Sequence, residues 1–350
     1  MLERLTASLA WIVATLLDTL PPGALRFLSG SGPIRRDGNE LEPDIQLILK
    51  LATLQGHRTL DTMTPKEARA DIRRTAAIAS GLVAPVARVE HLEIPGPAGP
   101  LKARLYVPTT ERRTRPLIVY YHGGGWVVGD LDTHDGVCRF LAHEVDAGVV
   151  SIDYRLAPEH KFPAAVDDAV AAFRWAAREA TALGYDASRV AVAGDSAGGN
   201  LSAAVSLVTT REGGPRPMVQ LLIYPVTDLA NRAASYRLFA EGFFLTAAEM
   251  DWYIGHYLPS HDAAHDPRAS PLLASDLSGL PPALVLTAGF DPLRDEGEDY
   301  ARRLEAAGVR TWLRRFPGQV HGFCNMTSLS PSARAAMLEA ARKLADELHI

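Results

Sequence analysis

The sequence contains few cysteines and no excess of positive charge, and each shortage excludes a class of protein. Cys138 and Cys324 are the two cysteines among 350 residues, too few for a disulfide scaffold or a cysteine-based metal site. We expect them to be buried free thiols in a reducing, cytoplasmic compartment. Lys and Arg number 36 against 41 Asp and Glu, a formal charge of −5, which argues against a nucleic-acid-binding protein.

Long hydrophobic runs are also scarce. The apolar stretch at 5–17 has 13 residues, whereas a membrane-spanning helix needs about 20. Its spacing predicts an amphipathic helix packed on the protein's own body or on a second copy in a homodimer. Contact of residues 1–20 with a membrane surface and export behind a cleaved signal are the alternatives, although no Ala-x-Ala site follows. The apolar face comprises Leu5, Leu9, Ile12, Leu16 and Leu20.

The overall composition is that of a folded globular protein. A hydrophobic share of 47% with 22% charged residues excludes disorder for most of the chain. Residues 31–40 are polar and rich in turn formers, which indicates a linker. We therefore treat 1–40 as an N-terminal extension and predict that its deletion leaves the catalytic chemistry intact. Residues 41–84 have a helical pattern, with Thr64 as the N-cap of a helix that begins at Pro65.

From about residue 87 onwards, short β-branched runs alternate with helical patterns. This alternation predicts an α/β fold with a mostly parallel central sheet and helices on both faces. The expected strands lie at 101–107, 117–121, 148–153, 190–193, 221–224, 284–287 and 311–316. The expected helices include 164–183, 200–211, 294–307 and 332–348. Sites in such sheets lie beyond the C-terminal ends of the strands.

A Gly-Asp-Ser-Ala-Gly motif at 194–198 follows an expected strand and precedes a helix that we expect to begin near Asn200. This is the strand–turn–helix context of a nucleophile elbow. The sharp turn strains the serine backbone, and glycines two residues to either side avoid a collision. A glycine-rich turn in an ordinary βα unit is the alternative, but the context favours Ser196 as the nucleophile. We expect the adjacent Asp195 to hydrogen-bond neighbouring loops.

A second glycine-rich loop, His-Gly-Gly-Gly-Trp at 122–126, follows another expected strand. Consecutive glycines let backbone amides approach an oxyanion, and HGGG-type loops have this role in lipases and esterases. A phosphate-binding loop is the alternative, but Val128 takes the place of the third glycine of G-x-G-x-x-G and no Walker sequence fits. We expect His122 to stabilise the loop by hydrogen bonding.

A serine nucleophile needs a base, and the base needs an acid that orients it. Asp291 stands at the C-terminal end of one expected strand and His321 on the loop after the next, which is the Ser…Asp…His order of α/β-hydrolases. Asp295 and Glu296 follow on a helix, where they would complement the helix dipole. No pair of histidines has H-E-x-x-H spacing, so we expect neither a metal nor a cofactor. We expect surface or structural roles for His134, His143 and His160, whose neighbours in the sequence indicate helices or loops.

Taken in order, these motifs resemble those of the hormone-sensitive-lipase-like family of α/β-hydrolase esterases, in its bacterial Gly-Asp-Ser-Ala-Gly branch. The resemblance covers about residues 41–350. It implies the α/β-hydrolase fold, a triad of Ser196, Asp291 and His321, and an oxyanion hole formed by three amides. Those amides belong to Gly124, Gly125 and Ala197. The motifs that carry the resemblance lie at 122–126, 153–159, 194–199, 291–297 and 321–323.

The same resemblance implies a helical cap over the pocket. Residues 41–86 would supply its N-terminal helices, and an insertion at about 228–262 would complete it within a catalytic domain at 87–350. An acyl or alcohol pocket could be lined by Trp126, Phe243, Phe244 and Trp252, although aromatic residues in the insertion equally suit the core of the cap. Gln319 departs from the family, whose members commonly carry Met there.

These features predict a carboxylic ester hydrolase that works through an acyl-enzyme on small-molecule esters with short to medium acyl chains. An amidase, carbamate hydrolase or lactone hydrolase would use the same triad and is the nearer alternative. A ligand-binding receptor, as in the plant gibberellin receptors of this family, is the more distant one, because those receptors lack the catalytic histidine and His321 is present here. Relatives often form dimers through the last strand and the neighbouring helix.

Overall fold

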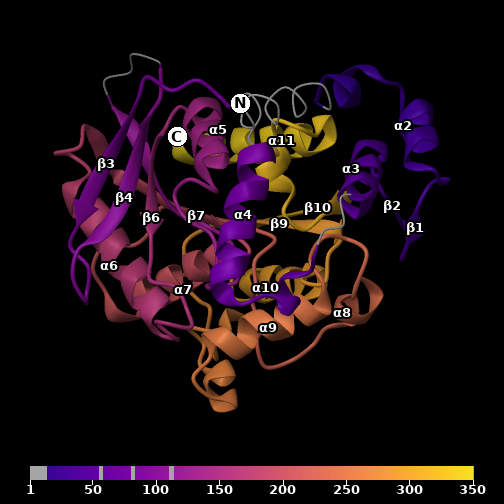
Figure 1. The fold of residues 1–350 in the computed structure, drawn as a ribbon. Coiled ribbons are helices and arrows are strands. Elements are labelled where there is room, and N and C mark those ends of the chain that lie inside the picture. The colour runs from indigo at the N-terminus through magenta and orange to yellow at the C-terminus, as the bar shows by residue number, and fades with distance from the viewer. Residues whose placement is uncertain (1–13, 55–57, 80–82, 110–113, 350) are drawn as a thin grey trace.

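The computed structural model describes residues 14–54, 58–79, 83–109 and 114–349 (Figure 1). Most of the amphipathic helix expected near the N-terminus, including Leu5, Leu9 and Ile12, lies outside these residues, while 14–19 are helical. Among the helices of the described part, none combines the length and the apolar character that a bilayer-spanning segment requires.

A central sheet of eight strands organises the molecule. The strands are β3 (Arg88–Ile94), β4 (Leu101–Val107), β5 (Arg115–Tyr121), β6 (Gly148–Asp153), β7 (Tyr185–Asp195), β8 (Gln220–Ile223), β9 (Ala283–Phe290) and β10 (Thr311–Val320). Their order across the sheet is β10-β9-β8-β7-β5-β6-β4-β3. Strand β4 is antiparallel to both of its neighbours, and the other pairs are parallel. The mostly parallel sheet is thus confirmed, and β3 is a strand that the sequence analysis missed.

Five long helices pack on the two faces of this sheet. They are α5 (Asp135–Val145), α6 (Ala164–Glu179), α7 (Ala197–Glu212), α10 (Arg294–Ala306) and α11 (Pro331–Leu348). Successive strand residues point to opposite faces, so Val119 of β5 packs in the cluster of Val205 on α7, while Ile118 packs with Leu141 on α5. In Figure 1, α5 and α11 lie above the sheet and α6, α7 and α10 lie below it. Helix α5 was not predicted.

Further helices lie over the C-terminal ends of the strands. They are α3 (Pro43–Leu54), α4 (Pro65–Ala79), α8 (Ala234–Leu238) and α9 (Ala247–Tyr257). Helix α4 begins where the sequence predicts, because Thr64 Oγ1 accepts the Glu67 N–H at 3.3 Å and the Glu67 carboxylate accepts the Thr64 N–H at 2.9 Å. The two parts of this layer contact each other, since the Leu60 N–H donates to the Glu249 carboxylate at 3.0 Å.

Residues 31–40 are not the linker that their composition indicated. They contain a hairpin of β1 (Arg35–Arg36) and β2 (Asn39–Glu40). The turn residues Asp37 and Gly38 have φ values of 53° and 74°, which is the type I′ geometry that an Asp-Gly pair favours. The prediction was wrong because polar turn formers are typical both of linkers and of tight hairpin turns.

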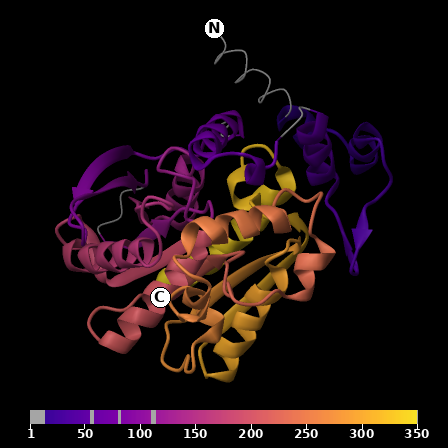
Figure 2. The same ribbon diagram turned by 60° about the horizontal axis from the view of Figure 1, so that its bottom comes forward.

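The N-terminal segment packs on the body of the protein. Leu17, in the helical stretch 14–19, and Leu25, on α2 (Pro22–Ser29), lie in one buried cluster with Phe290 at the end of β9 and Val320 at the end of β10. Figure 2 shows this segment, in indigo, beside the orange and yellow strands at that edge of the sheet. Residues from the beginning of the chain thus pack against the C-terminal ends of β9 and β10.

Candidate active site

Ser196 occupies the turn between β7 and α7. Its backbone has φ 55° and ψ −118°, a left-handed conformation that is unfavourable for a residue with a Cβ. The flanking glycines allow the turn, because a Cβ on Gly194 would collide with the carbonyl of Gly198, and one on Gly198 with the carbonyl of Tyr121. Helix α7 begins directly at Ala197 rather than near Asn200, so Ser196 stands at its positive N-terminal end.

Three side chains from separate loops form one hydrogen-bonded chain. Ser196 Oγ lies 3.0 Å from His321 Nε2, and His321 Nδ1 lies 2.8 Å from Asp291 Oδ2. Because a carboxylate only accepts, Nδ1 carries the proton and Nε2 can accept the serine hydroxyl proton. Asp291 is fully buried, and its other oxygen accepts the Leu293 N–H at 2.8 Å. This arrangement can remove a proton from the serine and stabilise the resulting imidazolium.

The sheet explains why these residues meet. Ser196, Asp291 and His321 each follow directly after the C-terminal end of a strand, namely β7, β9 and β10. Parallel strands bring such ends to the same edge. Val320 pairs with Phe290, so the residues that come next in the chain, the acid and the base, lie side by side.

The glycine-rich loop at 122–126 is a tight turn next to Ser196. The Gly124 carbonyl accepts the Val127 N–H at 3.0 Å and the Val128 N–H at 2.9 Å. Gly124 has φ 114°, and a Cβ there would collide with the Val128 carbonyl. Gly125 has φ 56°, and a Cβ there would collide with the ring of Tyr253. The loop therefore needs glycine at both positions.

Backbone N–H groups are available to an oxyanion at this point. Gly124 and Gly125 both line the cavity that contains Ser196. The N–H of Ala197 belongs to the first turn of α7, where the helix itself offers no acceptor. The three amides expected to bind an oxyanion are thus close to the serine in the fold, two on the loop and one on the helix.

Asp195 anchors the glycine-rich loop from behind. Its buried carboxylate accepts the Tyr120 hydroxyl at 2.6 Å and the Gly123 N–H at 2.9 Å. Burial alone would raise the pKa of Asp195, but His134, Tyr120 and the Gly123 amide together hold it at about 2. Asp195 is therefore a carboxylate bonded to a neighbouring loop, as predicted.

His122 is a buried, neutral part of the loop. Burial lowers the pKa of His122 to about 4. Its Nδ1–H donates to the Gly123 carbonyl at 2.8 Å. The ring stacks on Tyr154 at 4.3 Å between centroids, and the Tyr154 hydroxyl donates to the His122 carbonyl at 2.7 Å. These contacts confirm that His122 stabilises the loop.

His134 has a place in the site that the sequence did not indicate. Its Nε2 lies 3.3 Å from the Gly123 nitrogen and 3.4 Å from Asp195 Oδ1, and its side chain lines the cavity. His143 and His160 are exposed, which agrees with the surface roles expected of them. Nothing in the local sequence distinguished His134 from these two, because only the return of the chain over the loop brings it to the site.

Helix α4 holds the far end of the loop. Arg69 Nε donates to the Val127 carbonyl at 2.8 Å, and an Arg69 terminal nitrogen donates to the Ala157 carbonyl at 2.8 Å. The same guanidinium forms two hydrogen bonds to Glu159, at 2.9 and 2.6 Å. These bonds lower the pKa of Glu159 to about 2. One arginine thus connects α4 to the end of the glycine-rich loop and to the 153–159 motif.

The cavity in front of Ser196 has a volume of about 170 Å³. Its wall opposite the sheet is apolar and comes from α4 and from the segment around α9. The residues that line the cavity are Ile72, Gly123, Gly124, Gly125, Val128, Gly129, His134, Asp195, Ser196, Val226, Leu245, Met250, Tyr253, His321, Gly322 and Asn325. A cavity of this size accommodates a group of about six heavy atoms, as benzene-binding cavities of about 150 Å³ do.

None of the four aromatic residues considered for the pocket is in the lining of this cavity, and for Phe243 and Phe244 the alternative of a core position agrees with the structure. Trp126 is fully buried and stacks on Tyr257 at 4.1 Å. Phe243 packs on Phe290 at 5.0 Å, and Phe244 packs against the same N-terminal cluster.

Trp252 lies one residue before the aromatic side chain that does line the cavity. It makes a T-shaped contact with Tyr253, which covers Gly125. In a helix of 3.6 residues per turn, residues three apart lie on the same face and adjacent residues do not. Met250 and Tyr253 of α9 therefore both line the cavity, and Trp252 does not.

The acidic residues after Asp291 are not surface groups that merely complement a helix dipole. Glu296 is buried, and its Oε1 accepts the Thr227 N–H at 2.7 Å and the Asp228 N–H at 3.3 Å. Burial raises the pKa of Glu296 to about 8. Asp295 accepts the Ser235 N–H at 2.9 Å. Both acids therefore connect α10 to the segment before α9.

The described part of the chain has neither a candidate metal site nor a disulfide. No group of three or more His, Cys, Asp or Glu side chains is arranged there to hold a metal ion. Cys138 and Cys324 are buried and unbridged, as predicted from their number.

Comparison with known proteins agrees with this geometry. A family model for the α/β-hydrolase fold matches residues 118–325. The carboxylic ester hydrolase LipN of Mycobacterium tuberculosis is 45% identical over 96% of this chain and 91% of its own length. An ethyl acetate hydrolase of Pseudomonas putida is 37% identical over 88% of this chain and 99% of its own length.

A solved structure gives the same result in three dimensions. The ester hydrolase EH1AB1 from the metagenome of Lake Arreo, in complex with a bipyridine phosphonate derivative, superposes with a TM-score of 0.85 at 44% identity. The superposition covers 89% of this chain and the whole of the other.

Proposed function

The chain belongs to the hormone-sensitive-lipase-like esterases of the α/β-hydrolase family and is a carboxylic ester hydrolase, and we propose that it works through a Ser196–His321–Asp291 triad and an acyl-enzyme. The observation that carries this proposal is the hydrogen-bonded chain of 3.0 and 2.8 Å that joins the three side chains. The strained backbone of Ser196 between two required glycines supports it.

In the first half of the reaction, Ser196 Oγ attacks the ester carbonyl while His321 Nε2 takes the hydroxyl proton. Asp291 holds the imidazole in its Nδ1–H tautomer and stabilises the positive charge. His321 then gives the proton to the leaving alkoxide, and the alcohol departs. In the second half, His321 takes a proton from water while the hydroxide attacks the acyl-enzyme. The bond between the acyl carbon and Ser196 Oγ then breaks, His321 returns the proton to Oγ, and the carboxylic acid leaves.

The oxyanion of each tetrahedral intermediate would accept N–H groups from Gly124, Gly125 and Ala197. Preorganised donors of this kind contribute about 3–4 kcal/mol each in well-studied hydrolases. The contacts of Asp195 with Gly123, and of Arg69 with Val127, hold the glycine loop at both ends. The oxyanion donors thus need little reorganisation when charge develops.

We assign short to medium acyl chains to the substrate. The cavity of about 170 Å³ has Ile72, Leu245, Met250 and Tyr253 in its lining. Apolar walls of this size suit an acyl group of a few carbons. In this proposal the cap comprises residues 41–86 and about 228–262, and the catalytic domain spans 87–350.

The triad is tested by Ser196→Ala with p-nitrophenyl butyrate as the substrate. We expect kcat to fall by roughly 10⁴–10⁶ with an unchanged melting temperature. Ser188→Ala is the matched control, because Ser188 is an exposed residue on the same strand, and its kcat should equal that of the wild type. Turnover retained by Ser196→Ala would refute the assignment.

The acyl preference is tested with p-nitrophenyl acetate, butyrate, octanoate and palmitate. We expect kcat/KM to be highest for the two short esters and at least about tenfold lower for palmitate, since each extra CH₂ beyond the cavity wall stays in water. Met250→Ala should widen the cavity and move the optimum to longer chains. An equal kcat/KM across the series would contradict the proposed size limit.

A further inference from the structure

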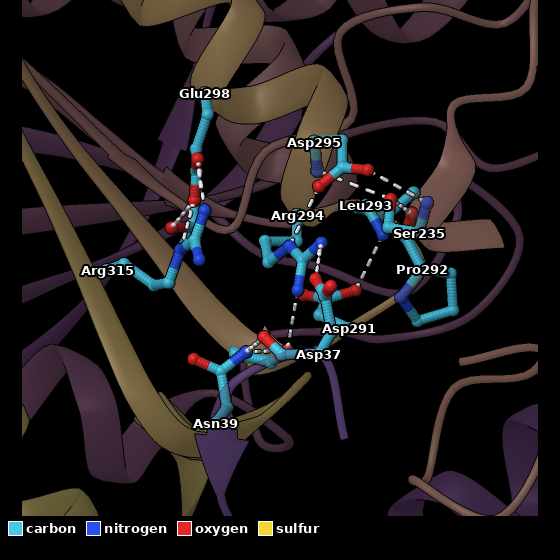
Figure 3. Close-up of polar contacts among 12 residues, drawn as sticks. Asp37, Asn39, Ser235, Asp291, Pro292, Leu293, Arg294, Asp295, Glu298 and Arg315 are labelled. Atoms are coloured by element: carbon cyan, nitrogen blue, oxygen red, sulfur yellow. Dashed lines mark hydrogen bonds and ion pairs between the residues drawn. The ribbon is translucent and has the colours of Figure 1, made fainter. Parts of the chain in front are cut away.

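The N-terminal hairpin reaches the loop that carries Asp291. Arg294, on the first turn of α10, is 4% exposed, and one of its terminal nitrogens lies 2.7 Å from Asp37 Oδ2 in the hairpin turn. The Nε of the same guanidinium lies 2.8 Å from Asp295 Oδ1. Figure 3 shows Arg294 between these two carboxylates, with Asp291 beside it. A buried guanidinium next to the triad thus takes one of its two counter-charges from the N-terminal extension.

The same contacts bind the end of β9. Arg294 donates to the Gly289 carbonyl at 3.3 Å, and Asn39 Nδ2 lies 3.5 Å from that oxygen. The Arg294 N–H donates to the Asp291 carbonyl at 3.2 Å. The Gly289 carbonyl, two residues before Asp291, is therefore held by Asn39 of the hairpin and by Arg294, the arginine that pairs with Asp37.

The segment before His321 contacts the backbone of residues 40–42, at the end of the hairpin. The Glu42 N–H donates to the Gly318 carbonyl at 3.0 Å. A Cβ on Gly318 would lie 2.9 Å from the Glu40 carbonyl oxygen, so the backbones are in direct contact. The pairing of β9 with β10 is irregular between Phe316 and Val320, and this irregular stretch is where the N-terminal residues support it.

We propose that Asp37 is a positioning residue of the active site, which holds Arg294, and through it the Asp291 loop, in the arrangement that lets Asp291 face His321. This inference rests on the triad of the proposed function. It replaces the expectation that the first 40 residues are dispensable for the chemistry, because their last residues complete the surroundings of the catalytic acid.

Charge as well as shape is involved. Without Asp37, Arg294 would keep one carboxylate partner for its buried positive charge, and the excess charge would disfavour the imidazolium form of His321. The acid limb of kcat/KM, which reports the free base, would then move to lower pH. A loop that was merely loosened would not shift the limb in that direction. The charged groups around the Asp291 loop are Asp37, Arg294, Asp295, Glu298 and Arg315, which Figure 3 shows, and His321.

The test is Asp37→Asn in the full chain. Asparagine is well tolerated at positive φ, so the hairpin turn is kept and only the charge is removed. We expect kcat to fall about 3–10-fold with KM within about twofold, and the acid limb of kcat/KM to move down by about 0.3–0.5 pH unit, since the pair is partly exposed and screened.

Asp18→Asn is the matched control. Asp18 also belongs to the N-terminal segment, forms an ion pair with Arg334 on α11, and has a side chain that is 42% exposed, against 43% for Asp37. Removing the charge of Asp18 should leave kcat and the pH dependence of kcat/KM unchanged.

Three outcomes would overturn the inference. They are a wild-type kcat with an unmoved acid limb in Asp37→Asn, a fall in kcat without a shift of the limb, and equal losses in Asp18→Asn. A failure of the triad itself would be seen separately, as activity retained by Ser196→Ala. Melting temperatures of all variants show whether each is folded at the assay temperature.

Discussion

The glycine-rich loop at 122–126, here called the oxyanion loop, and the loop that carries His321 border the same cavity, and Asp291 lies behind His321. Different parts of the chain hold these two sides of the site. The oxyanion loop is shaped largely by its own glycines and by near neighbours such as Val128. The acid and base loops are supported by Asp37 and Glu42 from the beginning of the chain. The first side therefore combines a required backbone shape with hydrogen bonds from Asp195 and Arg69, whereas the second depends on charge and hydrogen bonds supplied by the beginning of the chain.

This difference predicts how strongly substitutions on each side of the site should reduce activity. A backbone collision cannot be relieved by small shifts in a close-packed site, so changes in the oxyanion loop should be severe. Removing one hydrogen-bond partner from a network that keeps its other partners should reduce activity less than such a collision does. The predictions below run from the change that should damage the oxyanion side most to one that should alter only the pH dependence of stability on the acid side.

Gly124→Ala should have the largest effect. The new Cβ would collide with the Val128 carbonyl at a φ of 114°, which displaces an oxyanion donor. We expect kcat for p-nitrophenyl butyrate to fall about 10²–10³-fold and the melting temperature to drop. Gly255→Ala is the control, since a Cβ there meets nothing within 4 Å and alanine is the better helix former. A Gly124→Ala enzyme within tenfold of the wild type would contradict the shape argument.

Asp195→Asn should have the next largest effect. Tyr120 and Gly123 both donate to Oδ1, which the amide keeps, but the negative charge that strengthens these two bonds would be lost. An NH₂ group would also replace Oδ2, to which the Tyr224 hydroxyl donates at 3.5 Å. We expect kcat to fall about 10–100-fold, equivalent to about 1–3 kcal/mol. Asp186→Asn, at the other end of β7, should remain within twofold of the wild type. Equal kcat values for the two variants would show that the anchor behind the loop is not needed.

Arg69→Gln should have a smaller effect on the oxyanion side. Its hydrogen bonds to the Val127 and Ala157 carbonyls would be lost, and we expect kcat to fall by about threefold to tenfold. The Glu159 side chain is 56% exposed, so the ion-pair part of the stability loss should be about 0.5 kcal/mol at pH 7.

The pH dependence of that variant follows from Glu159. Because the pKa of Glu159 is lowered to about 2 in the folded protein, the ion pair stabilises the fold above the ordinary pKa of about 4.5 and is lost as the pH falls towards 2. The stability difference between the wild type and Arg69→Gln should narrow over this range, measured by urea unfolding. Arg74→Gln is the control, because its partner Asp71 is on the same helix. Its kcat should equal that of the wild type.

Glu296→Gln should leave kcat nearly unchanged and alter stability on the acid side. Burial raises the pKa of Glu296 to about 8, so the folded protein binds a proton that the unfolded chain releases above pH about 4.5. Stability is thus lost as the pH rises from about 4.5 to 8. The variant should melt like the wild type near pH 4.5 and a few degrees higher near pH 8.5.

Differential scanning calorimetry across this pH range measures the effect of Glu296→Gln. Glu305→Gln provides the comparison, because Glu305 is an exposed residue on the same helix and its melting temperature should follow that of the wild type at every pH. A melting temperature of Glu296→Gln that runs parallel to the wild type would mean that Glu296 is ionised in the folded state at neutral pH.

The elements that the sequence predicted well are those with strong local patterns. The strands expected at 101–107 and 148–153 have those bounds in the structure. The first largely alternates apolar with charged residues and the second is rich in β-branched residues, and both patterns are typical of strands. Strand β3 was missed because it lies at the edge of the sheet, where six of its seven residues are exposed or half-buried. Such a strand has no apolar run to reveal it.

By itself, the sequence determined the features that depend on a few adjacent residues. The glycines around Ser196, the glycine-rich loop and the cap of α4 each follow from sterics and hydrogen bonds within one turn of chain. The order of Ser196, Asp291 and His321 along the chain likewise indicated the fold, since each comes at the end of a strand.

Only the tertiary structure decided what surrounds those features. It placed Tyr253 rather than Trp252 at the cavity, brought His134 to the oxyanion loop, and paired Asp37 with Arg294. These contacts join residues far apart in the chain, and no periodicity or spacing reports them. They depend on how helices and loops pack against the finished sheet, where volume and charge are matched across segments that have no relation in sequence.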